Sequence, residues 1–335
     1  MSGQDVLAGL SDSAFLGDVD DRDRDVGRIV GSVMAGLGAG LVAAIVATVI
    51  LMVGFVFATG AAGHGPTGIS GSLTSLMTSD VHDVNTAVFV LLLPALTNGP
   101  LALAFIALVA LILRHRFMDY VTQAAKLRWR LMFTGLMLCA LMMTPLVLAE
   151  RLFDPQVPAM PLLSLSHAIG GRLFYLGAVI VLLIPAAAAE EILFRGWLLR
   201  QTGAFLKNPI ALMLINGVVF SALHFDFQPD SFLIRMLMGA GFTYMTLRLG
   251  GIEFSTGAHA ANNILIVLFL EPLTLRPAVS SGFSILTFAE MATLAIGSVV
   301  ITEAVVRVDI LRRWTGLRDE DLAAPRSAMT AESFA

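Results

Sequence analysis

Residues 173–195 read LFYLGAVIVLLIPAAAAEEILFR, and this stretch decides the class of the fold. The 17 residues 173–189 contain no charge, and the carboxylates Glu190 and Glu191 and the cation Arg195 follow them. A helix needs about 20 apolar residues to cross a bilayer. A charged side chain near the bilayer centre costs roughly 2.5 kcal/mol or more. The stretch therefore predicts a membrane-spanning helix whose charged residues have a function.

The composition extends this prediction to the whole chain. Hydrophobic residues make up 57% of the 335 residues and charged residues 14%, whereas about 25% of the residues in soluble domains are charged. We expect an all-α polytopic membrane protein with about eight transmembrane helices and a polar site inside the bundle. The apolar segments are 29–58, 86–113, 131–149, 173–199, 208–227, 232–249, 252–270 and 284–306.

Basic residues between these segments predict the orientation. The loop 114–130 carries five Lys and Arg residues, whereas the loop 59–85 carries none. Cytoplasmic loops of membrane proteins are enriched in Lys and Arg. Arg151, Arg172 and Arg276 fall on the other side and weaken this bias without reversing it. We therefore expect an integral protein of the bacterial inner (plasma) membrane, with both termini cytoplasmic.

The remaining parts of the chain carry few functional signals. The first 25 residues hold seven Asp and two Arg, which is typical of a solvated segment and unlike a cleavable signal peptide. The single cysteine, Cys139, excludes an intramolecular disulfide. No nucleotide-binding loop is present, and we expect no nucleic-acid partner. We divide the chain into an acidic disordered tail (1–27), N-terminal transmembrane helices with their loops (28–172), a core (173–270), a last transmembrane helix with a basic membrane-edge stretch (271–314) and a polar tail (315–335).

The polar residues of the core stand one helical turn apart in pairs. Glu191 and Arg195 are spaced i,i+4 with the acid first, the favourable order for an ion pair, so Glu190 is left free to act as a base. Phe220 and His224 have the same spacing, and the Phe ring is expected to pack against the imidazole. His259 and Asn263 repeat it and place two hydrogen-bond donors for an oxyanion on one helix face.

A rise of 1.5 Å per residue tests whether these residues share one depth. Counted from the cytoplasmic helix ends, Glu190 lies about 14 Å and His259 about 12 Å into the membrane. His224 lies about 24 Å in, roughly 10 Å too deep. The segment 208–227 is therefore tilted or broken, or its boundaries are wrong.

Together the motifs resemble those of a known family. In order they are Glu190-Glu191-x-x-x-Arg195, Phe220-x-x-x-His224 and His259-x-x-x-Asn263. This pattern resembles the CAAX-protease and bacteriocin-processing (CPBP) family of intramembrane proteases, which is related to the type II CAAX prenyl endopeptidases. The resemblance covers about residues 173–270. It implies hydrolysis of a peptide bond in a membrane-associated protein or peptide, within the lipid bilayer.

The resemblance also implies a role for each residue. Glu190, with His224, would activate the attacking water. His259 and Asn263 would stabilise the oxyanion, and Glu191 and Arg195 would shape the site. A metalloprotease site is chemically allowed, with zinc held by Glu190, His224, His259 and a water. A metal-free glutamate mechanism uses the same residues, so no cofactor is certain at this stage.

Other interpretations of the same residues stay open from the sequence. Glu191 and Arg195 can form a purely structural ion pair, and His224 can cap a helix end at the membrane surface. Asn263 can bridge two helices, with Asn262 as an adjacent rival for its role. The main alternative function is a non-enzymatic membrane protein, either a proton-coupled transporter or a scaffold, because carboxylates and histidines also form proton relays.

Overall fold

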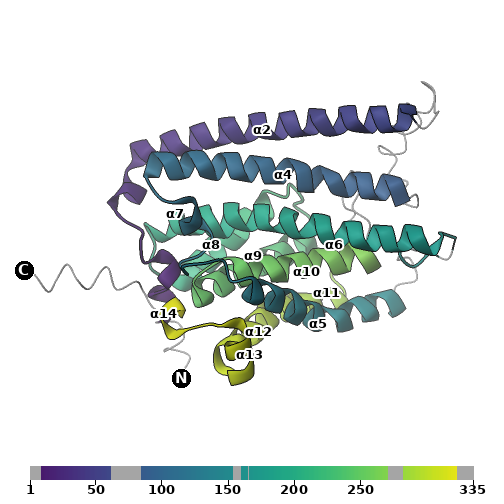
Figure 1. Ribbon diagram of the computed structural model, residues 1–335. Coiled ribbons are helices and arrows are strands. Elements are labelled where there is room, and N and C mark those ends of the chain that lie inside the picture. The colour runs from purple at the N-terminus through teal and green to yellow at the C-terminus, as the bar shows by residue number, and fades with distance from the viewer. Residues whose placement is uncertain (1–8, 62–83, 154–159, 165, 271–281, 323–335) are drawn as a thin grey trace, which may run out of the picture.

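The computed structural model describes residues 9–61, 84–153, 160–164, 166–270 and 282–322. Of these residues 82% are helical, and they form no β-strand beyond an isolated bridge between Thr122 and Gly251. Figure 1 shows the helices. The membrane-region elements are α2 (Val26–Ala61), α4 (Val84–Leu113), α5 (Trp129–Phe153), α6 (Ile169–Glu191), η4 (Ile192–Leu198), α7 (Leu199–Gly203), α8 (Pro209–Ala222), α9 (Pro229–Leu249), α10 (Glu253–Phe269), α11 (Ile285–Ala292), η5 (Thr293–Gly297) and α12 (Ser298–Arg307). Short elements flank them: η1 (Ala14–Leu16), η2 (Asp21–Arg24), η3 (Phe117–Tyr120), α13 (Asp309–Thr315) and α14 (Asp319–Leu322).

An all-α membrane fold is confirmed, and each of the eight predicted segments coincides with helical structure. Five helical stretches are long and apolar enough to cross a membrane: Val26–Phe55, Ala87–Leu113, Trp129–Phe153, Ile169–Gly203 and Ile285–Arg307. The other three segments correspond to α8, α9 and α10. The helix α8 has only 14 residues, so it spans about 21 Å. These three helices are outside the five candidate crossings that length and composition identify among the described residues.

The helices pack in a consistent order around the core segment. The outermost helix, α2, lies along α4, and α4 packs on α6 (Figure 1). On its other side α6 contacts α10, which packs against α5. The surface of α2 is lined with exposed apolar side chains such as Val30, Leu41 and Ile50, as a lipid-facing helix requires. The helices that carry the polar motifs, α6 and α10, thus lie next to each other inside the bundle.

Small residues let the inner helices approach closely. A Cβ at Gly257 of α10 would lie 1.9 Å from the carbonyl oxygen of Met132, and a Cβ at Gly135 of α5 would lie 2.2 Å from that of Phe254. Neither position has room for a side chain. The helix pair α8 and α9 crosses in the same way, since a Cβ at Gly239 would lie 2.9 Å from the Cα of Gly217. These contacts fix the positions of α9 and α10 relative to the helices beside them. The geometry of the polar site depends on these positions.

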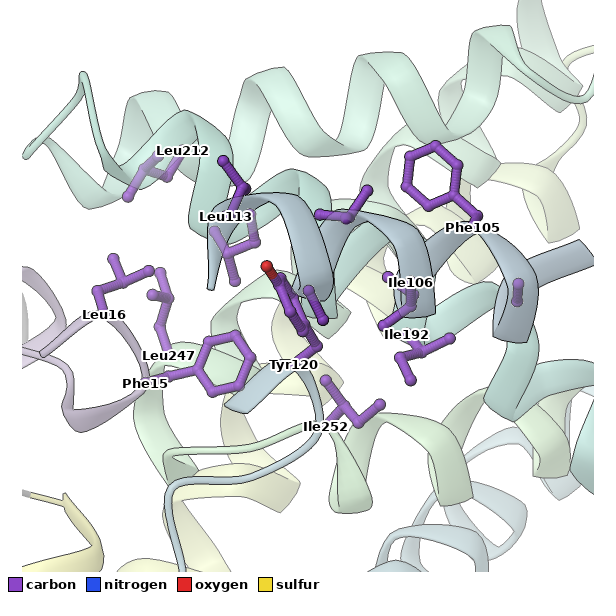
Figure 2. Close-up of a cluster of buried hydrophobic side chains, with 14 of the residues drawn as sticks. Phe15, Leu16, Phe105, Ile106, Leu113, Tyr120, Ile192, Leu212, Leu247 and Ile252 are labelled. Atoms are coloured by element: carbon purple, nitrogen blue, oxygen red, sulfur yellow. The ribbon is translucent and has the colours of Figure 1, made fainter. Parts of the chain in front are cut away.

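The acidic N-terminal segment differs from the disordered tail that its composition predicts. Over residues 9–25 it folds onto one end of the bundle. Phe15 is fully buried in a cluster with Tyr120, Leu247 and Ile252 (Figure 2). The Ser13 hydroxyl donates a hydrogen bond to the carbonyl of Leu247. Burial of these apolar side chains outweighs the cost of ordering an acidic segment.

Charged groups complete this docking. Nη1 of the buried Arg200 donates to Asp18 at 2.7 Å and to the carbonyl of Phe15 at 3.0 Å. The Nε2 atom of His115 lies 2.9 Å from Asp23. A hydrogen bond from Arg22 lowers the pKa of Asp20, so this carboxylate is ionised at neutral pH. The charge count of the sequence does not predict that this segment docks on the bundle, because it includes the aspartates without their arginine and histidine partners.

The described ends of the chain meet at one end of the bundle. A Cβ at Gly250, which ends α9 with φ +68°, would lie 2.3 Å from the carbonyl oxygen of Asp321 and 3.6 Å from the Cβ of Ala14. Residues 14 and 321 therefore lie at the same end of the described helices.

Candidate active site

The first motif lies where the long helix α6 changes geometry. Regular α-helix ends at Glu191, and the next seven residues, Ile192–Leu198, form a π-helical turn that includes Arg195. Such turns are rare and are found mostly at functional sites. The expected ion pair is present, since Nη1 of Arg195 donates to Oε1 of Glu191 at 2.9 Å and both side chains are 0% exposed.

The third motif binds the same carboxylate. Nδ1 of His259 lies 2.9 Å from Oε1 of Glu191. Because a carboxylate only accepts hydrogen bonds, Nδ1 carries the proton in this contact. Nε2, the other ring nitrogen, then faces Glu190, whose Oε2 atom lies 3.7 Å away. Glu191 thus connects the first motif to the third and orients the imidazole.

The two adjacent glutamates differ sharply in their surroundings. The Glu191 side chain is fully buried, whereas that of Glu190 is 23% exposed. Glu191 is held by a cation and an imidazole on one oxygen. Glu190 is partly exposed, and its Oε2 atom lies 3.7 Å from Nε2 of His259. The structure therefore separates a buried structural carboxylate from an accessible one, as the helical angle between them predicts.

Aromatic rings enclose Arg195. Its Cζ atom lies 4.4 Å from the ring centroid of Phe220, 5.2 Å from that of Phe242 and 5.7 Å from that of Phe194. Aromatic faces within about 6 Å attract a cation. In addition, Nη2 donates to the carbonyl oxygen of Gly239 at 3.1 Å. Arg195 is therefore held by its carboxylate, by one main-chain carbonyl and by aromatic faces, although no water reaches it.

His224 lies beyond the helix that was expected to carry it. The helix α8 ends at Ala222, so the predicted boundary of 227 is wrong, and His224 stands on the exposed turn before α9. Over its 14 residues α8 still spans about 21 Å, so the earlier helix end removes only about 3 Å of the excess depth of His224. Its Nδ1 atom lies 2.7 Å from the carbonyl oxygen of Phe220, so the ring donates there and Nε2 keeps its lone pair. The ring meets Phe220 edge-on at 4.7 Å, and the charge of Glu190 acts on it.

The turn that carries His224 is itself constrained. Phe225 has φ +54°, a left-handed conformation that is uncommon for a bulky side chain. The next residue, Asp226, forms an ion pair with Arg235 of α9 at 2.8 Å. Leu223, Phe225 and Phe227 are exposed around the histidine. The turn thus exposes an imidazole with apolar side chains around it.

Asn263 shares α10 with His259, one turn further along. Within the described part of the chain, its carboxamide oxygen accepts a hydrogen bond from Nδ2 of Asn262 at 3.4 Å. Asn263 is half-buried, whereas Asn262 is only 5% exposed and its Oδ1 atom has no hydrogen-bond partner. The two neighbouring amides are therefore coupled, and Asn263 is the more accessible of the pair.

The donor atoms of the conceivable zinc site do not converge. Among the described residues, two groups bring three or more His, Cys, Asp or Glu ligand atoms within 4.8 Å of one another, and both centre on His115. Glu190, His224 and His259 do not form such a group. In that arrangement three protein ligands would have to lie around one tetrahedral ion. The residues present do not fit a preformed three-ligand zinc site.

Sequence analysis missed two groups of the site. The carbonyl of Gly239 and the ring of Phe242 both lie on α9, in a segment without any of the three motifs. Phe242 stacks on His259 with the ring centroids 5.1 Å apart and the planes inclined by 29°. The run Gly239-Ala-Gly241-Phe242 was a usable signal, since small residues mark a close helix approach.

Comparison with known proteins agrees with the position of the motifs. The chain is 34% identical over 169 residues to "Uncharacterized protein YyaK" of Bacillus subtilis (strain 168), in a match that covers 48% of this chain and 55% of that relative. The chain thus spans about half the length of this relative. No solved structure matches. Residues 172–265, which carry all three motifs, match the family model described as "Type II CAAX prenyl endopeptidase Rce1-like", and this match confirms the resemblance that the motifs predict.

Proposed function

We propose that the protein is an intramembrane endopeptidase that uses Glu190 to activate water. The observation that carries the proposal is the contrast between the two glutamates: Glu190 is accessible, whereas Glu191 is fully buried in contact with Arg195 and His259. One carboxylate is fixed as a support, and the other is free for chemistry. The family match over residues 172–265 supports peptide-bond hydrolysis as that chemistry.

The reaction needs four side chains. Glu190 takes a proton from water, and the resulting hydroxide attacks the carbonyl carbon of the scissile bond. The Nε2 lone pair of His224 helps to orient that water. For the next step Nε2 of His259 must carry a proton in addition to Nδ1, so that it and the side-chain amide of Asn263 can donate hydrogen bonds to the negative oxygen of the tetrahedral intermediate. When the C–N bond breaks, the proton held by Glu190 passes to the leaving amine.

We favour the metal-free form of this mechanism. In the zinc alternative, His224 and His259 would both have to turn a nitrogen toward one ion beside Glu190. Nδ1 of each ring is already engaged, in His224 by the Phe220 carbonyl and in His259 by Glu191. The remaining Nε2 atoms do not lie within 4.8 Å of each other and of Glu190 together. The same groups serve general-base catalysis without any rearrangement.

The surroundings of the site favour a substrate that arrives from the bilayer. Leu223, Phe225 and Phe227 expose apolar surface beside His224. Exposed aromatic side chains of this kind are suited to lipid or to an apolar peptide. We therefore propose membrane-associated proteins or peptides as substrates, and the bacterial inner membrane as the location. A proton relay would spread its groups through the membrane, whereas here Glu191 contacts both Arg195 and His259, and Glu190 lies beside the same imidazole.

A proteomic comparison tests the proposal. Membranes that contain wild-type protein or Glu190→Ala are compared for peptide termini that depend on the carboxylate. The matched control is Glu290→Gln, which removes a half-buried carboxylate of α11. We expect new termini with the wild type and the control, and none with Glu190→Ala. Identical termini in all three membranes would contradict an endopeptidase.

A further inference from the structure

Helix α9 contributes to the site although it carries none of the three motifs. The ring of Phe242 is 2% exposed and contacts an imidazole and a guanidinium at once. It stacks on His259 at 5.1 Å, and Cζ of Arg195 lies 5.2 Å from its centroid. One turn earlier, the carbonyl of Gly239 accepts a hydrogen bond from Arg195.

These contacts surround a single oxygen atom. Oε1 of Glu191 accepts from Nη1 of Arg195 and from Nδ1 of His259, each at 2.9 Å. The ring of Phe242 covers both donors of that oxygen. A second ring, Phe220, meets His259 edge-on at 5.8 Å with the planes inclined by 79°. The plane of the imidazole is therefore set by the face of one aromatic ring and by an edge-on contact with another.

The orientation of the imidazole decides which atom reaches the substrate. With Nδ1 on Glu191, Nε2 points to Glu190. A partial rotation of the ring about its Cβ–Cγ bond would turn its plane away from the face of Phe242, so the stacking opposes it. A complete half-turn would keep the ring plane but break the Glu191 contact, so the hydrogen bond opposes it.

We propose that Phe242 is a positioning residue of the reaction, which holds His259 in the rotamer that keeps Nδ1 on Glu191 and Nε2 on Glu190. This inference rests on the proposed function. Phe242 affects how precisely His259 contacts the transition state rather than how tightly the substrate binds, because Phe242 contacts the imidazole and is itself buried. Contact between an aromatic face and a cation or an imidazole raises the rate about tenfold if the contact stabilises only the transition state.

The test compares Phe242→Leu with Phe254→Leu. Both residues are buried in the same hydrophobic cluster, at 2% and 0% exposure, so the two changes remove similar apolar contact. Only Phe242 stacks on His259. Purified variants are assayed on a substrate peptide for kcat and KM and for thermal stability. We expect Phe242→Leu to lower kcat about tenfold or more with KM nearly unchanged, and Phe254→Leu to lower stability alone.

The second part of the test asks whether an aromatic substitution at position 242 restores kcat. Phe242→Tyr keeps the aromatic face and should restore most of kcat, whereas Phe242→Leu should not. If Phe242→Leu and Phe254→Leu lower kcat equally, or if Phe242→Tyr is as slow as Phe242→Leu, the positioning role is wrong. The failure of the proposed function would look different, because peptide cleavage would then be independent of Glu190 as well.

Discussion

Oε1 of Glu191 lies 2.9 Å from Nδ1 of His259, across 68 positions of sequence. The same oxygen accepts from Arg195, so one buried carboxylate supports both the first and the third motif. The i,i+4 spacing predicts the contact with Arg195 alone. The contact with His259 gives Glu191 a second task, which is to fix the direction of the imidazole.

Removal of Arg195 should be strongly destabilising. Arg195→Ala leaves the carboxylate of Glu191 buried and without its cation, and such a loss typically costs about 3–5 kcal/mol. The double variant Glu191→Ala/Arg195→Ala should recover part of the thermal stability but none of the activity, because His259 then lacks its anchor. Thermal melts and cleavage assays check both statements.

An ion pair of the same spacing serves as the control for this prediction. Arg307 and Glu303 are also i,i+4, but the Arg307 side chain is 50% exposed. Arg307→Ala should therefore change stability by only about 0–1 kcal/mol. Equal stability of Arg195→Ala and the wild type would mean that the Glu191–Arg195 pair is absent or solvated.

The docked N-terminal segment should contribute to stability through Phe15. Phe15→Ala empties a fully buried site between α7, α9 and the Tyr120 loop, and such changes cost about 3–5 kcal/mol. Phe205→Ala changes a side chain that is 57% exposed and should be nearly neutral. A solvated tail would instead leave the two variants equally stable in thermal melts of the purified protein.

Both ends of the chain should face the cytoplasm. The loop that contains Lys126 and Arg128 carries the basic excess, and residues 14 and 321 lie at one end of the bundle. Reporter domains fused to the N-terminus and to the C-terminus should both give cytoplasmic signals. A periplasmic signal from either fusion would show that the number of crossings is odd or the orientation reversed.

Removal of the His259 or Asn263 side chain should lower the cleavage rate without weakening substrate binding. If they hold the oxyanion, His259→Ala and Asn263→Ala should each lower the cleavage rate by about 10²–10³ and leave substrate affinity nearly intact. Metal content is measured in the same preparations. Zinc that is bound by active wild type and lost from His259→Ala would overturn the metal-free mechanism. Unchanged turnover in both variants would assign the third motif a structural role.

The helices and the local pairs of the site could be predicted because both follow from periodicity and length. The apolar run 173–189 specifies a helix, and the i,i+4 rule places Arg195 beside Glu191. Contacts between distant segments could not be predicted in this way. Nothing in the sequence of Phe242 shows that its ring stacks on His259, since this depends on how α9 and α10 cross.

The end of α8 shows a second limit. Leu223, Phe225 and Phe227 are apolar, so hydropathy extends the segment to 227. The helix nevertheless ends at Ala222, and the backbone turns at Phe225. The N-terminal segment shows a third. Its charge count predicts solvent exposure, but Arg200 pairs with Asp18 and His115 contacts Asp23, and both partners lie far away in sequence.

The most direct test of the account is the turnover of purified Glu190→Gln. The change removes the base and keeps the shape of a side chain that is 23% exposed, so the protein should fold with nearly unchanged thermal stability. Loss of a general base commonly costs about 10²–10⁴ in rate. We predict that cleavage of a peptide identified by the proteomic comparison falls by at least about 10². Wild-type turnover by correctly folded Glu190→Gln would contradict the assignment of Glu190 as the catalytic base.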